Sequence, residues 1–579
     1  MNKINGPTVM RRTTPLARAF PFVFVLCLPM SCGNLGDDCM YLKTCGGDEG
    51  GGGGVAGASG SGASTQGGQP SSMGGEGGRG AIAGQGGEAG IGGEGAASGM
   101  GGEGGAPSAC DTTKSPSVEA CVASDAHAVF VAPTGSDSSD GTRAEPLKSI
   151  AKALALAEAT SKVVVACNGK FDEHLSITTG ARLYGGFACP GEKVPWSYQQ
   201  GKRAQVVPSD EGSALEIRNV TDAVTIEDVE FYSRDATAPG GSSIAAIIER
   251  SDNVKIARVR IVAGAAMAGA DGESGSNGAD GESSISTQKG VDSICGTRAP
   301  ASQDGGAWSA DSACGSRAGN GGQAVKGSEG GPGFSGNPKT NVVLPQNPDD
   351  LNNRGSEGPE GGDGKPGAAG LSGALGQPAS NDGSFTALGF TPAAAGGAGS
   401  DGFPGQGGGG GGASNATGAC IGASGGAGGM GGCGGKGGTG GLGGGASVAL
   451  IAWSSAVTLD ACELVAQEGG AGGKGGDGGL GGLGKEGAVG GAAFSDASNS
   501  IGKGGNGGPG GNGGVGGPGA GGNGGPSIAL VFHGTAPEGV ASSVLTPGSA
   551  GAAGPGGTAG ALVGEDGRAG TASAQLSVP

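Results

Sequence analysis

The chain has 579 residues, of which 142 are glycine, and its formal net charge at pH 7 is −18. Glycine usually accounts for only about 7% of residues, so this excess excludes ordinary helical or α/β structure over long tracts. The acidic balance argues against nucleic acid as a partner, because phosphate recognition needs clustered Lys and Arg.

Residues 1–31 predict an export signal. Basic residues precede an apolar run from Phe20 to Leu28, which is too short to span a membrane. The segment Leu28-Pro29-Met30-Ser31-Cys32 resembles the cleavage box of bacterial lipoproteins, although Pro29 departs from the pattern. The resemblance implies a lipid on Cys32 and a tether at the bacterial outer membrane or cell surface; secretion without a lipid is the alternative.

Residues 32–125 predict a flexible stalk. They consist largely of Gly, Ser, Ala, Glu and Gln, with few large apolar side chains. Such a segment cannot bury enough apolar surface to offset the conformational entropy lost on ordering.

The cysteines predict local disulfides. Apart from Cys27 and Cys32, ten of the remaining eleven fall into sequential neighbours, which suits an oxidising compartment. We expect the pairs Cys39 with Cys45, Cys110 with Cys121, Cys167 with Cys189, Cys295 with Cys314, and Cys420 with Cys433. Cys462 is left over and predicts a buried thiol. The chain has no Cys-x-x-Cys and only three histidines, so we expect no metal site and no cofactor.

Residues 126–263 predict a folded head that begins with a strand at 128–131, a helix over 147–157 and further strands at 163–166, 175–177 and 181–184. The head resembles the start of right-handed parallel β-helix proteins of the pectin-lyase-like superfamily, in particular the DUF1565 type. The motifs that carry this resemblance are Gly135-x-Asp137, Gly141-Thr142, Pro146-Leu147, Gly169-x-Phe171-x-Glu173 and Leu183-Tyr184-Gly185-Gly186-Phe187. The resemblance implies that the helix caps the first coil.

Four segments repeat one plan, in which a serine leads an apolar strand, a polar turn and a second apolar strand. They begin at Ser213, Ser243, Ser447 and Ser527. Stacked repeats of this kind bury one another's inward side chains. The predicted fold is therefore an all-β parallel β-helix, with later coils at 446–467 and 526–546.

Three glycine-rich insertions follow equivalent points of these coils, at 264–445, 468–525 and 547–579. We expect them to leave from one side of the solenoid. Their Gly-Gly-X triplets fit a bundle of extended threefold helices of the polyglycine II type, and they resemble the PGRS regions of mycobacterial PE-PGRS proteins. A collagen helix needs the same spacing, and a disordered loop avoids the ordering entropy of glycine; both stay open as alternatives.

The sequence offers few residues for catalysis. A pectate-lyase-like enzyme would need clustered acids and an arginine, for which the candidates are Asp222, Glu227, Asp228, Asp252, Arg258 and Arg260. Strand alternation places Glu227 and Arg258 on the outside, where solvation explains them. Glu173 and His174 could form an acid/base pair, but such a Glu commonly binds turn amides. Gly472 to Asp477 matches the start of a calcium-binding nonapeptide without a tandem copy.

These features favour a surface lipoprotein with a structural or adhesive role over an enzyme. The expected partners are the membrane, through the lipid anchor, and extracellular matrix, polysaccharide or another envelope protein. The alternative is a β-helix lyase or hydrolase that acts on acidic polysaccharide.

Overall fold

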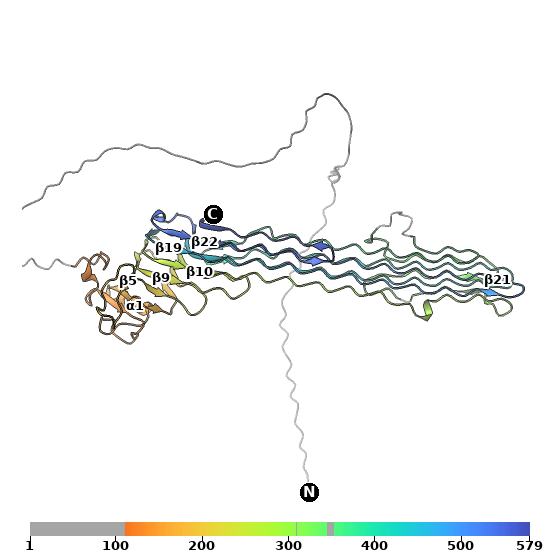
Figure 1. Cartoon of the computed structure of the whole chain (residues 1–579), viewed down its shortest axis with the longest axis horizontal. Coiled ribbons are helices and arrows are strands. Elements are labelled where there is room, and N and C mark those ends of the chain that lie inside the picture. Colours follow the sequence, from red (N-terminus) through yellow and green to blue (C-terminus); the bar gives the residue numbers. More distant parts are fainter. Residues whose placement is uncertain (1–109, 309, 344–351) are drawn as a thin grey trace, which may run out of the picture. The chain divides into compact units, whose positions relative to one another are not determined.

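The structure, a computed structural model, describes residues 110–308, 310–343 and 352–579. These residues belong to one compact unit of the chain, which combines a β-helix with a long bundle of glycine-rich runs (Figure 1). The predicted signal peptide, Cys32, Cys39 and Cys45 lie outside the described residues. Within the described ranges, no helix has the length and apolarity to cross a membrane.

Three six-stranded parallel sheets form the β-helix, which confirms the predicted fold class. The first sheet contains β1 (Ala128–Val131), β2 (Val163–Cys167), β5 (Ala181–Phe187), β8 (Val224–Glu227), β11 (Val254–Ala257) and β18 (Val457–Asp460). The second contains β4 (Leu175–Ile177), β7 (Leu215–Arg218), β10 (Ser243–Glu249), β17 (Ser447–Trp453), β22 (Ser527–His533) and β26 (Ala572–Val578). The third contains β3 (Lys170–Phe171), β6 (Ala204–Val206), β9 (Val229–Tyr232), β12 (Arg260–Val262), β19 (Glu463–Val465) and β23 (Val544–Thr546).

The core of the β-helix follows from the alternation along each strand. Leu215 and Ile217 of β7 point inward and are fully buried, while Glu216 and Arg218 between and after them are half-buried. Inward residues of successive coils stack in register, as Ile217 does on Ile248. Parallel pairing repeats this alignment from coil to coil, so one continuous apolar core runs through all three sheets.

Helix α1 (Ile150–Thr160) covers the first coil, as the resemblance to β-helix proteins implies. Its apolar face buries Ile150, Ala153 and Ala157 against the core. The carboxylate of Glu173 accepts hydrogen bonds from the N–H groups of Ile150 and Ala151, at 2.7 and 3.0 Å. It thereby satisfies two amides at the start of the helix that have no partner within the helix.

A ladder of buried serines marks the point where the insertions leave the β-helix. Ser243, Ser447 and Ser527 are aligned in the second sheet, whereas Ser213 lies one residue out of this register. The Ser447 hydroxyl donates to the carbonyl of Gly264 at 2.7 Å and accepts from the N–H of Gln467 at 2.9 Å. Ser243 and Ser527 likewise accept from the N–H groups of Gly264 and Gly548, so each of these three hydroxyls holds the first residues of an insertion.

The insertions form extended runs joined by backbone hydrogen bonds at every third residue. The first and second insertions run in parallel, with bonds from Gly269, Gly272, Gly275, Gly278 and Gly281 to the carbonyls of Ala471, Lys474, Asp477, Leu480 and Leu483. Within the first insertion, run 396–412 is antiparallel to run 424–445, with bonds such as Gly402 to Gly435. The ordered polyglycine II bundle is therefore the arrangement present. Its runs lie side by side and extend from one flank of the β-helix (Figure 1).

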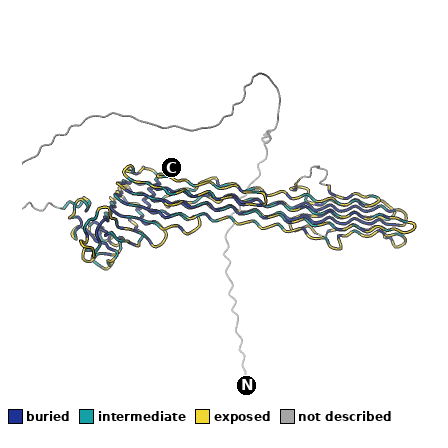
Figure 2. Tube along the Cα trace, viewed as in Figure 1, coloured by how far each residue is buried: buried dark blue, intermediate teal, exposed yellow. Residues whose placement is uncertain are grey.

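The inside of the bundle is buried although it contains almost no side chains. Most of its inner traces are buried, whereas the turns at its far end are exposed (Figure 2). A Cβ atom on Gly435 would lie 2.0 Å from the carbonyl oxygen of Gly479 on the adjacent run. Glycine is needed at such positions because any side chain would push the neighbouring backbone away.

Short elements interrupt the runs. They are the antiparallel hairpins β13 (Ser302–Gln303) with β14 (Ala324–Val325), β15 (Ser384–Thr386) with β16 (Gly389–Thr391), β20 (Phe494–Ser495) with β21 (Ser500–Ile501), and β24 (Thr558–Ala559) with β25 (Leu562–Val563). The 3-10 turns are η1 (Ala120–Val122), η2 (Ser286–Gln288) and η4 (Val540–Ser542).

The N-terminal boundary of the folded part differs from the prediction. The predicted stalk includes residues 110–125, but these pack on the β-helix: Val122 is fully buried in a cluster with Phe130 and Phe187. Local composition could not reveal this, because the contact is made both with the strand that follows directly, β1, and with β5, which lies much later in the chain.

Candidate functional site

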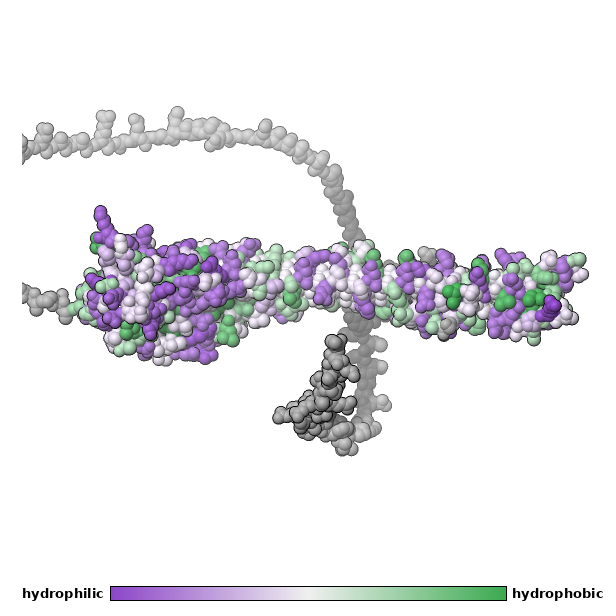
Figure 3. Space-filling model, turned by 90° about the horizontal axis from the view of Figure 1, so that it is seen from below, coloured by the Kyte–Doolittle hydropathy of each residue, from purple (hydrophilic) through white to green (hydrophobic). Residues whose placement is uncertain are grey.

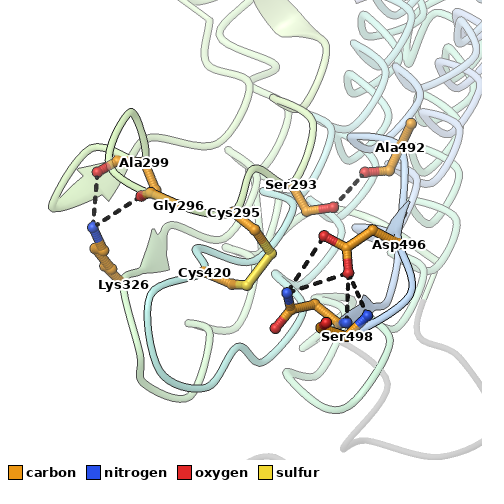
Figure 4. Close-up of a disulfide and its surroundings, with 10 residues drawn as sticks. Ser293, Cys295, Gly296, Ala299, Lys326, Cys420, Ala492, Asp496 and Ser498 are labelled. Carbon is orange, nitrogen blue, oxygen red and sulfur yellow. Dashed lines mark hydrogen bonds between the residues drawn. A yellow bond between two sulfur atoms is a disulfide. The ribbon is translucent and has the colours of Figure 1, made fainter.

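The distal part of the bundle carries two disulfides and the hairpin of β20 and β21. Cys295 pairs with Cys420, and this disulfide packs with Phe494 and Ile501 of the hairpin. Figure 4 shows the disulfide between two runs, next to the turn held by Asp496, which accepts a hydrogen bond from the N–H of Ser498 at 2.7 Å. Cys314 pairs with Cys433. Both bonds link separate passes of the chain.

The predicted sequential pairing of these four cysteines is wrong. The bonded partners are separated by 125 and 119 residues. In the bundle the nearest neighbour of a residue lies on an adjacent run, and the backbones of Ile294 and Ile421 exchange hydrogen bonds of 3.3 and 2.9 Å beside the first pair. The pairs Cys110–Cys121 and Cys167–Cys189 are confirmed, as is the buried thiol of Cys462.

Three of the residues considered for a lyase lie together at a corner of the β-helix. Asp228 and Arg258 occupy equivalent corners of successive coils, with φ angles of 52° and 55°. The Arg258 guanidinium binds Asp228 at 2.8 Å and Glu227 at 2.7 Å. The hydrogen bonds that Arg258 donates to Asp228 and Glu227, together with the charges of the two carboxylates, raise the pKa of Arg258. The cluster is thus an ion-pair network in which one guanidinium binds two carboxylates.

The expectation that solvation explains Glu227 is wrong. Glu227 and Asp228 are only 5% and 3% exposed, although alternation does direct Glu227 outward. The disulfide-closed segment 110–121 covers it, and the Ser115 hydroxyl donates to its carboxylate at 2.7 Å. Burial and the Glu227 charge raise the pKa of the adjacent Tyr184 to about 12. This cover leaves no open acid/base site at the corner.

The other candidates lie apart from this cluster. Asp222 and Asp252 are exposed in turns. Arg260 lies on the third sheet, where it binds Glu463 at 3.0 Å and the Tyr232 hydroxyl at 2.8 Å. Glu173 and His174 have separate partners. Glu173 binds the N–H group of Ile150 at the start of α1, whereas His174 Nε2 lies 2.9 Å from Asp210. The structure does not bring these residues to one face.

Side chains of Asp and Asn line the outside of the bundle and bind amides that no neighbouring run satisfies. Asp280 accepts from the N–H of Leu483 at 2.8 Å, Asp401 from Gly437 at 3.0 Å and Asp477 from Thr558 at 2.7 Å. Sequence reasoning did not assign this role. The signal available was the recurrence of Asp and Asn at multiples of three residues, as at Asp271, Asn277 and Asp280.

These carboxylates predict a bundle that weakens in acid. The Lys485 ammonium and the N–H of Leu483 lower the pKa of Asp280, and Lys436 with Gly437 does the same for Asp401. A carboxyl whose pKa is lower in the folded state stabilises that state above its ordinary value of 3.8 and loses this effect as the pH falls through the folded value. We expect the glycine amides of the bundle to have lower protection factors, that is, exchange rates corrected for intrinsic chemistry, at pH 2.5 than at pH 5, measured by hydrogen exchange.

The control is Asp280→Asn, which keeps the acceptor oxygen and removes the charge. It should reduce the acid dependence of amides near Leu483 and leave those near Asp401 unchanged. Exchange rates in the bundle that do not respond to pH, after correction for intrinsic chemistry, would contradict this account.

The acidic residue of the nonapeptide-like segment takes part in contacts within the bundle. Lys474 pairs with Asp477 at 3.0 Å, and Asp477 also accepts from the Thr558 hydroxyl. No group of three or more His, Cys, Asp or Glu with metal-binding geometry occurs in the part of the chain that the structure describes.

An apolar cavity of about 400 Å³ at the base of the bundle was not predicted. The hairpin of β15 and β16 folds back over the outer face of the second sheet, and its Phe385 and Phe390 line the cavity with Ile528 and Leu576. The sequence signal was weak: two isolated phenylalanines within a glycine-rich insertion.

Comparison with known proteins identifies the N-terminal half of the β-helix. Residues 133–230 match the model of a family described as "Protein of unknown function (DUF1565)". The match runs from the loop after β1 into β9. No curated protein and no solved structure matches the chain. DUF1565 is a pectin-lyase-like β-helix family, and the parallel sheets agree with it. Residues 133–230 are therefore a DUF1565 segment within a parallel β-helix.

Proposed function

We propose that this protein is a lipoprotein of the bacterial cell envelope with a structural or adhesive role. In this proposal the β-helix is a base from which the glycine-rich bundle is displayed toward matrix, polysaccharide or another envelope protein. The observation that carries the proposal is the bundle itself: runs bonded at every third residue, with two disulfides in the distal part.

The dimensions of the bundle support display. Run 469–491 is extended over 23 residues, and an extended threefold helix rises about 3.1 Å per residue, so the bundle projects roughly 70 Å. Backbone bonds on several sides hold each inner run, which makes the projection stiffer than a free glycine-rich linker. A stiff projection places its tip at a defined distance from its base.

The placement of charged residues favours display over catalysis. The carboxylates of the β-helix corner are paired with Arg258 and covered by residues 110–121. Figure 3 shows a mainly hydrophilic β-helix surface and separate apolar patches on the bundle. Such patches on an exposed projection fit a contact surface for a partner.

The proposed localisation outside the cytoplasm is supported by the segment around Cys32 and by the disulfides. The export signal and lipoprotein-like box precede the folded part, and four disulfides in the described residues fit a compartment outside the cytoplasm.

The test is the substitution Cys32→Ala, followed by fractionation of cells. We expect the wild-type chain in the membrane fraction and the variant in the soluble fraction, because the lipid on Cys32 is the membrane anchor in this proposal. Cys39→Ala is the matched control and should stay with the membrane. Retention of the Cys32→Ala variant in the membrane would contradict the lipid anchor.

A further inference from the structure

The third insertion ends much nearer the β-helix than the second. Its run 551–557 lies alongside runs 469–491 and 504–525, which bond to each other, and it bonds to both. Gly551, Gly554 and Gly557 donate to the carbonyls of Gly525, Gly522 and Gly519, all at 2.9 Å, while Gly472, Gly475 and Gly478 donate to Ala552, Pro555 and Thr558. At β24 and β25 the chain turns back, so these bonds stop at Thr558.

Beyond Thr558 the same two runs continue without this neighbour. We call residues 481–490 of one run and 504–516 of the other the open edge. Among the described residues, the N–H groups of Gly481 and Gly487 have no acceptor there, and the carbonyls of Gly507, Gly510, Gly513 and Gly516 have no donor. The spacing of these groups continues the pattern that run 551–557 satisfies.

Burial agrees that most of the open edge is uncovered: Gly507, Gly510 and Gly513 are half-exposed, whereas Gly516 is buried. Gly472 and Gly475 are buried beside run 551–557, whereas the equivalent Gly481, Gly484 and Gly487 are half-exposed. Leu480, Leu483 and Val489 of the same run are 51%, 55% and 54% exposed. Unpaired backbone groups beside exposed apolar side chains make this edge comparable to an unprotected edge strand of a β-sheet.

The chain closes half of this edge itself. Asn512 accepts from the N–H of Gly484 and Asn506 from that of Gly490, both at 3.0 Å. The residues at the alternating positions, Pro509 and Val515, have no side-chain acceptor. In the register that pairs Asn512 with Gly484 and Asn506 with Gly490, Pro509 lies opposite Gly487 and Val515 opposite Gly481. The N–H groups of Gly487 and Gly481 are therefore left free.

We propose that the open edge binds an extended segment of a partner protein that has glycine at every third residue. Run 551–557 shows why: a Cβ on Gly551, Gly554 or Gly557 would lie 2.0 to 2.1 Å from a carbonyl oxygen of run 469–491. The partner's glycines would donate to Gly507, Gly510 and Gly513, and the carbonyls of the residues that follow would accept from Gly481 and Gly487. This is strand addition, here to a polyglycine II bundle.

The proposal deepens the adhesive role and rests on the proposed display of the bundle. The probe is a fluorescent 18-residue peptide with three copies of the sequence Gly551 to Gly556, which has glycine at every third position. We expect it to bind the purified full chain in an anisotropy titration. A peptide with alanine at those every-third positions should bind at least tenfold more weakly.

The chain offers a variant that closes the edge from within. In Pro509→Asn/Val515→Asn, the new amides can accept from Gly487 and Gly481 as Asn512 does from Gly484, and affinity for the peptide should fall at least tenfold. The control is Leu371→Asn, an exposed apolar residue on run 353–377, which should leave binding unchanged. Circular dichroism of both variants checks that they fold.

Three results would overturn the proposal: no binding of the glycine peptide, equal binding of the alanine peptide, or equal binding by the closed-edge variant. Self-association of the wild-type chain that the closed-edge variant lacks would make a second copy the occupant and overturn the choice of a partner protein. The titration uses purified protein and does not depend on a lipid anchor. Failure of the peptide to bind and failure of the Cys32 fractionation are therefore separate results, and each can occur without the other.

Discussion

Gly435→Ala should unfold the bundle locally and lower the free energy of unfolding by at least about 1–3 kcal/mol, the range for overpacked interiors. The new Cβ would lie 2.0 Å from the carbonyl oxygen of Gly479 and 2.5 Å from its carbon. That carbonyl already accepts from Gly516 on a third run, so it cannot move away without breaking other bonds. Hydrogen exchange should show lost protection for Gly516 and neighbouring amides.

The matched control is Leu442→Ala on the same run. Leu442 is 46% exposed, and its replacement removes surface atoms while the backbone bonds remain. We expect a change within about 0.5 kcal/mol, as for an ordinary surface substitution. Equal effects of the two substitutions would show that the glycines are not held in close backbone contact.

The sequence predicts the conformation of the bundle better than its arrangement. Gly-Gly-X spacing predicts a threefold extended helix, because only such a helix returns glycine to the same side every third residue. It does not predict which runs are neighbours, since nearly every run offers the same donors and acceptors. The arrangement follows from where each insertion leaves the β-helix, which the coil repeats at Ser243, Ser447 and Ser527 do predict.

For the ion-pair cluster of Glu227, Asp228 and Arg258, the sequence predicts the direction of a side chain but not what covers it. Alternation predicts that Glu227 points outward, and it does, but the segment that covers it lies 112 residues earlier. A contact of this separation leaves no periodic signal in a single sequence. Cys110 and Cys121 were the available hint, because a disulfide-closed loop is more compatible with packing than a flexible stalk is.

The disulfide Cys314–Cys433 should contribute more stability than any local one in the protein. In the chain-entropy account, cross-linking a loop of about 100 residues stabilises by roughly 4–5 kcal/mol, against about 3 kcal/mol for a 15-residue loop. The separations are 119 residues for Cys314–Cys433 and 11 for Cys110–Cys121. Because Cys295–Cys420 stays intact, the loop that Cys314–Cys433 closes runs through that disulfide and consists of residues 295–314 and 420–433. We therefore expect Cys314→Ser/Cys433→Ser to lower the free energy of urea unfolding by about 3–4 kcal/mol, and Cys110→Ser/Cys121→Ser by less.

Peptide mapping of the unreduced protein tests the pairing itself. The structure predicts fragments that join Cys295 to Cys420 and Cys314 to Cys433, whereas local pairing would join Cys295 to Cys314.

The two patterns of disulfide pairing have different mechanical consequences. Sequential pairs would close small loops and leave the runs free to slide, while the observed pairs tie separate runs together, so a pull on the tip is transmitted through several runs to the β-helix. Fragments with the local pattern would therefore overturn both the arrangement of the distal runs and the stiffness on which the proposed display depends.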